Sequence, residues 1–266
     1  MKDFVFKKKF GQNFISDKNL LNAIASDAEI CEKDEVLEIG AGAGSLTQIL
    51  SEKAKHVVSF EIDRDLQEHL LGLDLKNVDF VFGDFMDFDM SKVEGMFGKN
   101  YKVVANLPYY ITTPIIFRIF EESEKVESLT IMVQKEVADR IAATPGNKTY
   151  GGYTAKLGLY AQVTGRFEVP PRCFMPAPHV DSAVVRIDRV DGVVPEGIDR
   201  EFVARVIDAA FAQRRKTIRN SMSANGFAKD ALDAAFEACD IAPTTRAETL
   251  DVAAFVRLAQ ELSHDA

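Results

Sequence analysis

The sequence of 266 residues is poor in cysteine and histidine, and the few it has are scattered. Its three cysteines, Cys31, Cys173 and Cys239, are far apart, odd in number and in no C-x-x-C pair. This distribution argues against a disulfide framework and against a structural zinc site. The four histidines show no metal-ligand spacing either, so we expect no bound metal and a reduced, cytoplasmic protein.

Long apolar runs are also missing. No stretch of about eighteen apolar residues is present that could span a membrane. The first residues, MKDFVFKKKFGQNF, lack the apolar core of a signal peptide. We therefore expect a soluble protein that is not exported. The oligomeric state stays open, with a monomer as the expectation, and nothing in the sequence resembles the heptad pattern of a coiled coil.

The net charge is −9, which at first argues against nucleic acid as a partner, because binding to phosphates needs Lys and Arg. The basic residues are clustered, however, while the acidic ones are dispersed. The two basic clusters are Lys7, Lys8 and Lys9, and Arg214, Arg215, Lys216 and Arg219. Arg215 and Arg219 are four apart, which predicts that they share a helix face. Such a run can be an ordinary solvated helix face or a set of phosphate contacts.

From residue 35 onward, short apolar runs alternate with amphipathic segments. Strands are predicted at 36–39, 57–60, 78–82, 102–105, 129–133 and 183–187. Helices are predicted at 45–53, 64–71, 113–122, 135–143 and 154–162. This alternation predicts an α/β fold with a mostly parallel, doubly wound sheet. The stretch 190–199 contains Gly and Pro and only helical periodicity follows it, so we expect a first domain over 1–190 and a helical domain over 191–266.

Three glycines follow the first predicted strand, in the sequence VLEIGAGAG at 36–44. Glycines there let the backbone turn sharply and approach a ligand closely. The spacing G-x-G-x-G after Glu38 departs from the G-x-G-x-x-G pattern of dinucleotide-binding folds. It resembles instead the E-x-G-x-G-x-G loop of class I methyltransferases, which hold S-adenosylmethionine. The alternative, an ordinary strand-to-helix turn, would rarely need three glycines.

Acidic residues end the next two predicted strands. Glu61 stands where a carboxylate can accept hydrogen bonds from both hydroxyls of a ribose. Asp84, in Gly83-Asp84-Phe85, is suitably placed for an adenine amino group. Each carboxylate alone could be a solvated loop residue or a helix cap. At successive strand ends beside a glycine loop, the pair favours ligand binding.

The sequence Asn106-Leu107-Pro108-Tyr109, with Tyr110 after it, follows the apolar run 101–105 and precedes a predicted helix start. It therefore lies at the carboxyl end of a strand, where ligands bind in open α/β sheets. A planar base could stack on the aromatic rings while its exocyclic amine donates to the amide oxygen of the asparagine and to a backbone carbonyl. The alternative is an ordinary turn in which the asparagine caps the helix.

Together these motifs resemble those of the KsgA-type ribosomal RNA adenine dimethyltransferases, over nearly the whole chain and in the family's order. The motifs are FGQNF (10–14), VLEIGAGAGSLT (36–47), Glu61, GDF (83–85), NLPYY (106–110), VPPRCFMPAPHVDSAVV (169–185) and FAQRRKTIRN (211–220). The resemblance implies a class I, Rossmann-like S-adenosylmethionine-dependent methyltransferase sheet with a small all-α C-terminal domain that binds RNA.

The resemblance also implies roles for single residues. The methyl donor would be contacted by Asn13, Ile15, Gly40, Gly42, Glu61, Asp84 and Asn106. The target adenine would be held by Asn106, Leu107, Pro108 and Tyr109, with Phe174 as a second stacking wall. Two positions depart from the family pattern: Ile15 stands where leucine is usual, and the loop YGGYT at 150–154 lacks the commoner Leu-Ser pair at its end.

The activity implied is methyl transfer from S-adenosylmethionine to the exocyclic N6 amines of adenines in 16S small-subunit rRNA, with two adjacent adenines each dimethylated. The partner implied is an immature 30S particle during ribosome biogenesis, and the basic clusters would contact its phosphates. The Asn106 side chain and the Leu107 carbonyl could accept hydrogen bonds from the two N–H groups of the amine and so orient the nitrogen lone pair. Two alternatives stay open: a methyltransferase of large-subunit rRNA, and an assembly factor whose main role is binding.

Overall fold

The structure is a computed structural model that describes residues 14–15, 17–107, 111–175, 177 and 180–263. The chain divides into two compact units. The first consists of Met1–Ala138 and Val163–Arg189, and the second of Asp139–Gln162 and Val190–Ala266. The last segment of the second unit thus begins beside the boundary that the sequence predicts. Residues 139–162 also join this unit, although the sequence analysis assigns them to the first domain.

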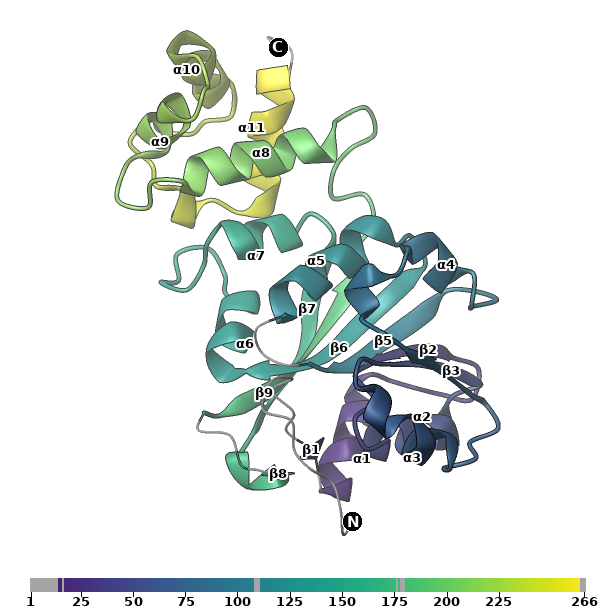
Figure 1. Cartoon of the computed structure of the whole chain (residues 1–266). Coiled ribbons are helices and arrows are strands. Elements are labelled where there is room, and N and C mark those ends of the chain that lie inside the picture. Colours follow the sequence, from purple (N-terminus) through teal and green to yellow (C-terminus); the bar gives the residue numbers. More distant parts are fainter. Residues whose placement is uncertain (1–13, 16, 108–110, 176, 178–179, 264–266) are drawn as a thin grey trace. The chain divides into compact units, whose positions relative to one another are not determined.

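Seven strands form one sheet in the order β4-β3-β2-β5-β6-β9-β7 (Figure 1). The strands are β2 (Glu35–Ile39), β3 (His56–Glu61), β4 (Val78–Phe82), β5 (Tyr101–Asn106), β6 (Val126–Gln134), β7 (Ala161–Val169) and β9 (Ser182–Arg189). The pairs β2/β3, β3/β4, β2/β5 and β5/β6 are parallel, and β9 runs antiparallel to β6. The prediction of an α/β fold with a mostly parallel sheet is confirmed. Because the chain builds outward from β2 to β4 and then returns to β5, the sheet has a switch point between β2 and β5, where such folds bind ligands.

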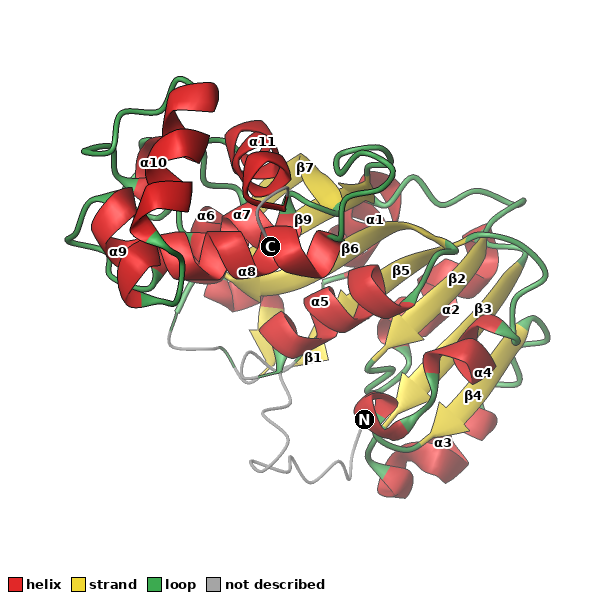
Figure 2. Cartoon of the chain, turned by 90° about the horizontal axis from the view of Figure 1, so that it is seen from above, coloured by secondary structure: helices red, strands yellow, loops and turns green. Residues whose placement is uncertain are grey.

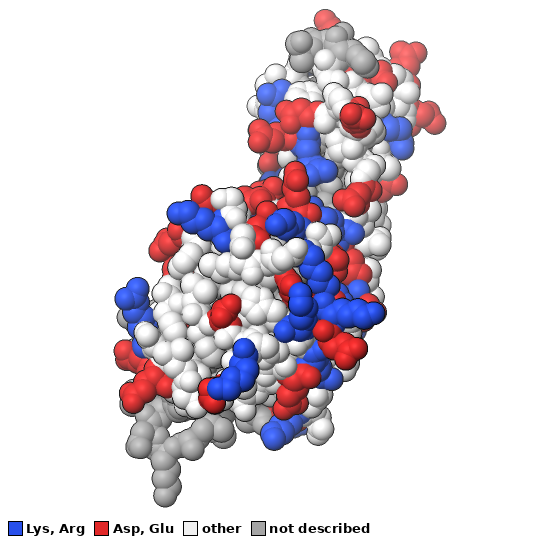
Figure 3. Space-filling model, turned by 90° about the vertical axis from the view of Figure 1, so that its right-hand side faces the viewer, with Lys and Arg blue, Asp and Glu red and all other residues white. Residues whose placement is uncertain are grey.

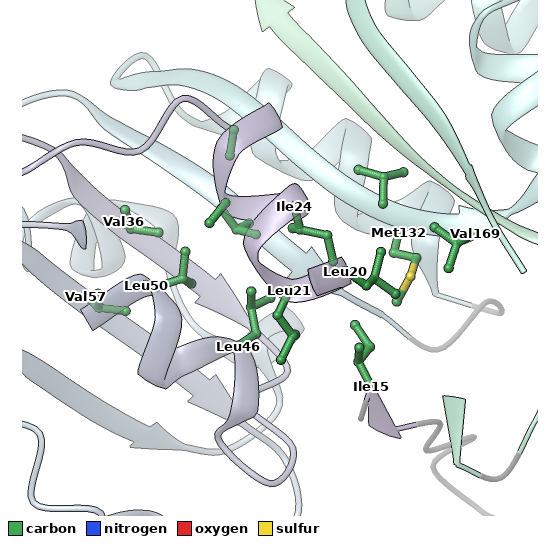
Figure 4. Packing of buried hydrophobic residues seen from close by; sticks show 14 of the residues in the cluster. Ile15, Leu20, Leu21, Ile24, Val36, Leu46, Leu50, Val57, Met132 and Val169 are labelled. Carbon is green, nitrogen blue, oxygen red and sulfur yellow. The ribbon is translucent and has the colours of Figure 1, made fainter. Parts of the chain in front are cut away.

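Helices cover both faces of the sheet (Figures 1 and 2). On one face, α1 (Lys18–Asp27) and α2 (Ser45–Lys53) share a buried apolar cluster with the strands. In it, Leu50 of α2 lies beside Val36 and Val57, and Ile24 belongs to the part that α1 contributes (Figure 4). The other face carries α4 (Met90–Glu94) and α5 (Thr112–Glu122). The short α3 (Gln67–Leu71) packs against β4. Asp17 begins α1 by accepting the Asn19 N–H at 2.8 Å, as a helix cap does.

Two features of the region 1–190, predicted as the first domain, differ from the expectations. A helix is predicted over 154–162, but α7 (Gly152–Leu157) ends earlier and strand β7 begins at Ala161. The sequence of β7, AQVTGRFEV, is half polar, as suits a strand at one edge of the sheet, so its apolar signal is weak. The second feature is a small antiparallel pair of strands, β1 (Phe14–Ile15) and β8 (Phe174–Met175), which the sequence analysis does not predict.

The second unit is helical. Besides α7 it contains α8 (Arg200–Phe211), α9 (Ile218–Ala224), α10 (Lys229–Ala238) and α11 (Val252–Ser263), while α6 (Lys135–Ile141) spans the division between the units. The segment before α7 belongs here because the Tyr150 hydroxyl donates to the Leu250 carbonyl at 3.0 Å and the Tyr150 ring meets Phe211 edge-on at 5.9 Å. Close packing continues at Gly158, where a Cβ would lie 2.6 Å from Val252 Cγ2. Within the described ranges, no helix is long and apolar enough to cross a membrane.

Candidate active site at the carboxyl ends of the parallel strands

The loop after β2 is shaped by glycines in the left-handed region. Gly40, Gly42 and Gly44 have φ values of +89°, +56° and +78°, which L side chains rarely adopt. The N–H groups of Gly40 and Ala41 both donate to the Phe60 carbonyl, at 2.9 and 3.0 Å, so the loop folds over the end of β3. A Cβ at Gly40 would lie 3.2 Å from the Asn106 carbonyl oxygen. The glycine therefore allows the loop to lie directly against the end of β5.

Glu61, the last residue of β3, is held by backbone donors from two loops. Its Oε2 accepts the Gly42 N–H at 2.7 Å, and its Oε1 accepts the Asp63 N–H at 2.8 Å. The side chain is only 5% exposed, and this burial raises the pKa of the carboxyl although both hydrogen bonds oppose the shift. A carboxylate offers about four acceptor positions. The acceptor positions that remain can accept the hydroxyls of a ribose, the role expected from the place of Glu61 at a strand end.

Asp84 lies two residues after the end of β4 and caps the short 3-10 helix η3 (Phe85–Asp87). Its Oδ1 accepts the Met86 N–H at 2.9 Å, which is the capping role considered as an alternative in the sequence analysis. The preceding Gly83 N–H donates to the Glu61 carbonyl at 2.9 Å. The cap fixes the direction of the carboxylate without using all of its acceptor positions. Capping and ligand binding are thus compatible at this residue.

The motif 106–109 is described in part. Asn106 is the last residue of β5 and lies opposite Met132 of β6, and Leu107 is buried, with 5% of its surface exposed. Pro108 and Tyr109 lie outside the described residues. The close approach of Gly40 to the Asn106 carbonyl completes a chain of contacts through Gly42 and Glu61. The structure thus brings together residues that are predicted to bind the methyl donor and that lie at the carboxyl ends of four neighbouring strands.

Ile15 and Phe174 are brought together in the first unit, in the apolar cluster that also contains Leu46, two residues after Gly44 of the glycine loop. They lie opposite each other in the β1/β8 pair, and each is 5% exposed within the apolar cluster of α1 and α2. Asn13, which is also predicted to contact the methyl donor, lies outside the described residues. Because the Phe174 ring is covered, a base could stack on it only after its neighbours move. The role of Phe174 as a stacking wall stays a prediction.

Glu38 is a buried acid at the end of β2, one residue before its last, and begins the glycine motif in the sequence. It is fully buried, and its Oε2 accepts hydrogen bonds from the Thr47 hydroxyl at 2.7 Å and the Ser59 hydroxyl at 2.5 Å. Burial raises its pKa to about 7, and the charge of Glu61 acts in the same direction. The three polar side chains join β2, α2 and β3 beneath the glycine loop. Nothing in the spacing of Thr47 and Ser59 along the sequence reveals this.

The second basic cluster lies in the helical unit, but not on one continuous helix. Because α8 ends at Phe211 and α9 begins at Ile218, Arg214, Arg215 and Lys216 lie in the turn between them, where they are exposed. The prediction that Arg215 and Arg219 share one helix face is therefore wrong. The Arg219 guanidinium forms a two-pronged ion pair with Asp233 of α10, at 2.5 and 2.6 Å. The first basic cluster, Lys7, Lys8 and Lys9, lies outside the described residues.

The charges on the surface are mixed in sign. Figure 3 shows acidic and basic side chains interspersed on one face of the molecule, so the net charge of −9 does not make this face uniformly negative. Phosphate binding then depends on where cations gather, as in the turn between α8 and α9. Over the residues that the structure describes, no three His, Cys, Asp or Glu side chains gather in a way that could hold a metal ion.

The chain is similar to known proteins over nearly its whole length. The family model described as ribosomal RNA adenine dimethylase matches residues 3–264. The Ribosomal RNA small subunit methyltransferase A of Caldanaerobacter subterraneus subsp. tengcongensis is 42% identical over 261 residues, covering 96% of this chain and 97% of that protein. The protein of the same name from Bacillus cereus (strain B4264) is 43% identical over 269 residues, covering 97% of this chain and 92% of that protein.

Solved structures show the same fold. A dimethyladenosine transferase from Plasmodium falciparum has a TM-score of 0.81 at 25% identity, over 94% of this chain and 98% of that one. The 23S rRNA methyltransferase ErmE has a TM-score of 0.75, also at 25% identity, over 94% of this chain and all of that one. A transferase named for dimethyladenosine and a methyltransferase named for 23S rRNA thus share the fold of this chain.

Proposed function

This chain belongs to the ribosomal RNA adenine dimethylase family, and from that premise we propose that it transfers methyl groups from S-adenosylmethionine to the N6 amines of adenines in small-subunit rRNA. The relatives named for the small subunit are 42–43% identical to it, whereas the 23S rRNA methyltransferase is 25% identical. The small subunit is therefore the favoured substrate. Two adjacent adenines, each dimethylated within an immature 30S particle, are the finer form of this proposal.

The observation that carries the proposal is the close approach of the glycine loop to the end of β5. Gly40 has a left-handed φ of +89°, and a Cβ added there would lie only 3.2 Å from the Asn106 carbonyl oxygen. Backbone alone separates the loop assigned to the methyl donor from the strand end assigned to the adenine. A donor and an acceptor bound on these two segments would be neighbours, which is the requirement for direct transfer.

The donor supplies a methyl group on a positively charged sulfonium. The described residues fit such a molecule: the Glu61 carboxylate, bound by the Gly42 N–H of the glycine loop, keeps acceptor positions for a ribose. Asp84, fixed by its cap, would accept the amino group of the donor's adenine. These residues bind and orient, and we assign no proton transfer to them.

On the acceptor side, an exocyclic amine is a weak nucleophile because its lone pair is delocalised into the ring. The Asn106 side-chain oxygen and the Leu107 carbonyl would accept hydrogen bonds from the two N–H groups of the amine. They would thereby favour a pyramidal nitrogen whose lone pair points at the methyl group. Polar groups placed in advance in this way lower the barrier without reorganising during the reaction. Pro108 would set the turn, and the Tyr109 and Phe174 rings would hold the base.

The test is to map the methylated nucleotides on both ribosomal RNAs. Purified protein is given S-adenosylmethionine with a labelled methyl group and either 30S particles or 50S subunits from a strain that lacks the corresponding modification. We expect label in 16S rRNA alone, recovered as dimethyladenosine at two adjacent positions after nuclease digestion and mass spectrometry. Label confined to 23S rRNA would assign the large-subunit activity instead. Tight 30S binding without label would support the assembly-factor alternative.

A further inference from the structure

Arg118 of α5 joins two segments that carry different parts of the proposed reaction. Its Nη1 donates to the Phe85 carbonyl at 2.9 Å, and its Nη2 donates to the Phe88 carbonyl. Both carbonyls belong to the turn that Asp84 begins. The helix α5 starts at Thr112, a few residues after the adenine-binding motif.

The arginine fork is well defined because its surroundings hold it. The side chain is only 10% exposed, and its Nε donates to Glu122 Oε2, one helical turn along α5, at 3.1 Å. The guanidinium also lies 5.4 Å from the centre of the Phe85 ring, within the range of a cation–π contact. Five donors in a rigid plane suit arginine to bind two carbonyls at once, which a lysine ammonium cannot do with the same geometry.

The turn that Arg118 holds is packed against the donor site. The Phe85 and Phe88 rings both meet the Phe60 ring edge-on, with centroids 5.3 and 5.0 Å away. Phe60 precedes Glu61, and its carbonyl receives the N–H groups of the glycine loop. The Phe88 ring also covers Gly83, where a Cβ would lie 2.9 Å from it. A shift of this turn would therefore move the Asp84 carboxylate relative to Glu61.

We propose that Arg118 is a positioning residue for the methyl donor: by holding the Phe85 and Phe88 carbonyls it fixes the Asp84 carboxylate where it can accept the amino group of the donor's adenine. This inference rests on the proposed function, since it assumes that Asp84 contacts the donor. Arg118 itself touches neither substrate. Arg118 affects which base of the methyl donor the site accepts. If the Asp84 carboxylate is displaced, it can no longer distinguish a 6-amino group from a 6-oxo group.

The experiment measures the affinity of the protein for two probes, S-adenosylhomocysteine and S-inosylhomocysteine, by calorimetry. The second probe carries an oxygen in place of the amino group that Asp84 is proposed to accept. In Arg118→Met, which keeps the length of the side chain but removes the fork, we expect about tenfold weaker binding of the adenine probe, the scale of one lost charged hydrogen bond. Binding of the inosine probe should change little, so the preference for adenine shrinks by the same factor.

Matched variants separate positioning from general damage. Glu122→Gln removes the charge that pairs with Nε and leaves both carbonyl contacts, so it should bind both probes as the wild type does. Arg118→Lys keeps the charge without the fork and should fall between the wild type and Arg118→Met. If Arg118→Met is too unstable to measure, Arg118→Lys carries the test alone, and an unchanged preference for adenine in it overturns the proposal.

The outcomes also separate this inference from the proposed function. Equal weakening of both probes, or no weakening in Arg118→Met, overturns the positioning role while the wild type still binds S-adenosylhomocysteine. If the wild type binds neither probe, the proposed function itself fails. An Asp84→Asn variant that retains the full preference for adenine would contradict the assignment of Asp84, and with it the role of Arg118.

Discussion

Replacing Gly40 by alanine tests the approach of the glycine loop to the end of β5. The residue has a φ of +89°, and an added Cβ would lie 3.2 Å from the Asn106 carbonyl oxygen. The left-handed backbone costs an L residue roughly 1–2 kcal/mol. The contact adds a second cost, because either the loop or the end of β5 must move by a few tenths of an ångström. We expect lower stability together with weaker binding of the methyl donor.

The chain offers a matched control in Gly146. Its φ is +85°, almost the same, but nothing lies within 4 Å of the Cβ that a substitution would add. Gly146→Ala therefore introduces the backbone strain without the steric contact. It lies in an exposed loop of the helical unit, so it should leave donor binding unchanged.

The assay combines urea denaturation with calorimetric binding of S-adenosylhomocysteine. We expect both variants to lose roughly 1–2 kcal/mol of stability from the strain of the left-handed backbone. Only Gly40→Ala should lose affinity for S-adenosylhomocysteine, by about tenfold or more, because displacements of under 1 Å at a reaction site have effects of this size. Wild-type affinity in Gly40→Ala would refute the claim that this close approach builds the donor site.

Three further predictions concern charged groups. Burial raises the pKa of Glu38 to about 7 from an ordinary value of 4.5. Between these values the folded protein binds more protons than the unfolded chain, so its stability should fall as the pH rises through this window. In Glu38→Gln, the denaturation midpoints at pH 5 and pH 7.5 should differ less than in the wild type, and an unchanged difference would count against this assignment. Arg215→Gln should reduce the slope of log affinity for rRNA against log salt by about 0.7–0.9. Arg219→Gln should reduce this slope less, because Asp233 already pairs with Arg219. Equal changes in the two variants would contradict the idea that the ion pair with Asp233 withholds Arg219 from the RNA. In a strain whose growth depends on this protein, Glu61→Ala should abolish methylation of the rRNA, and full growth without methylation would indicate that binding to the subunit is the essential role.

Much of the fold could be predicted because its central strands are short, apolar and separated by amphipathic helices. The predicted strand 36–39 differs from β2 (Glu35–Ile39) by one residue, and the predicted strand 78–82 matches β4. The edge strand β7 could not be found in this way, because its outward side chains are polar. The β1/β8 pair is only two residues long, which is too short to give a periodic signal.

The candidate site could be predicted as far as local motifs reach. Glycine spacing and carboxylates at strand ends indicated the segments that Gly40, Glu61 and Asp84 occupy in the structure. Contacts between distant segments were beyond such reasoning. The ion pair of Arg219 with Asp233 joins two helices, and the fork of Arg118 joins α5 to the turn after β4. Pairings of this kind depend on tertiary packing, which a single sequence does not encode in any local pattern.

The central claim is that the end of β5 holds the adenine amine beside the methyl donor. The most direct test is the single-turnover rate of methyl transfer to 30S particles in Asn106→Ala, with donor and protein in excess over particles. We predict a loss of about 10²-fold or more, comparable to removing one oriented polar group at a transition state, with 30S binding retained. A single-turnover rate near that of the wild type would contradict the assignment of this strand end as the site of methyl transfer.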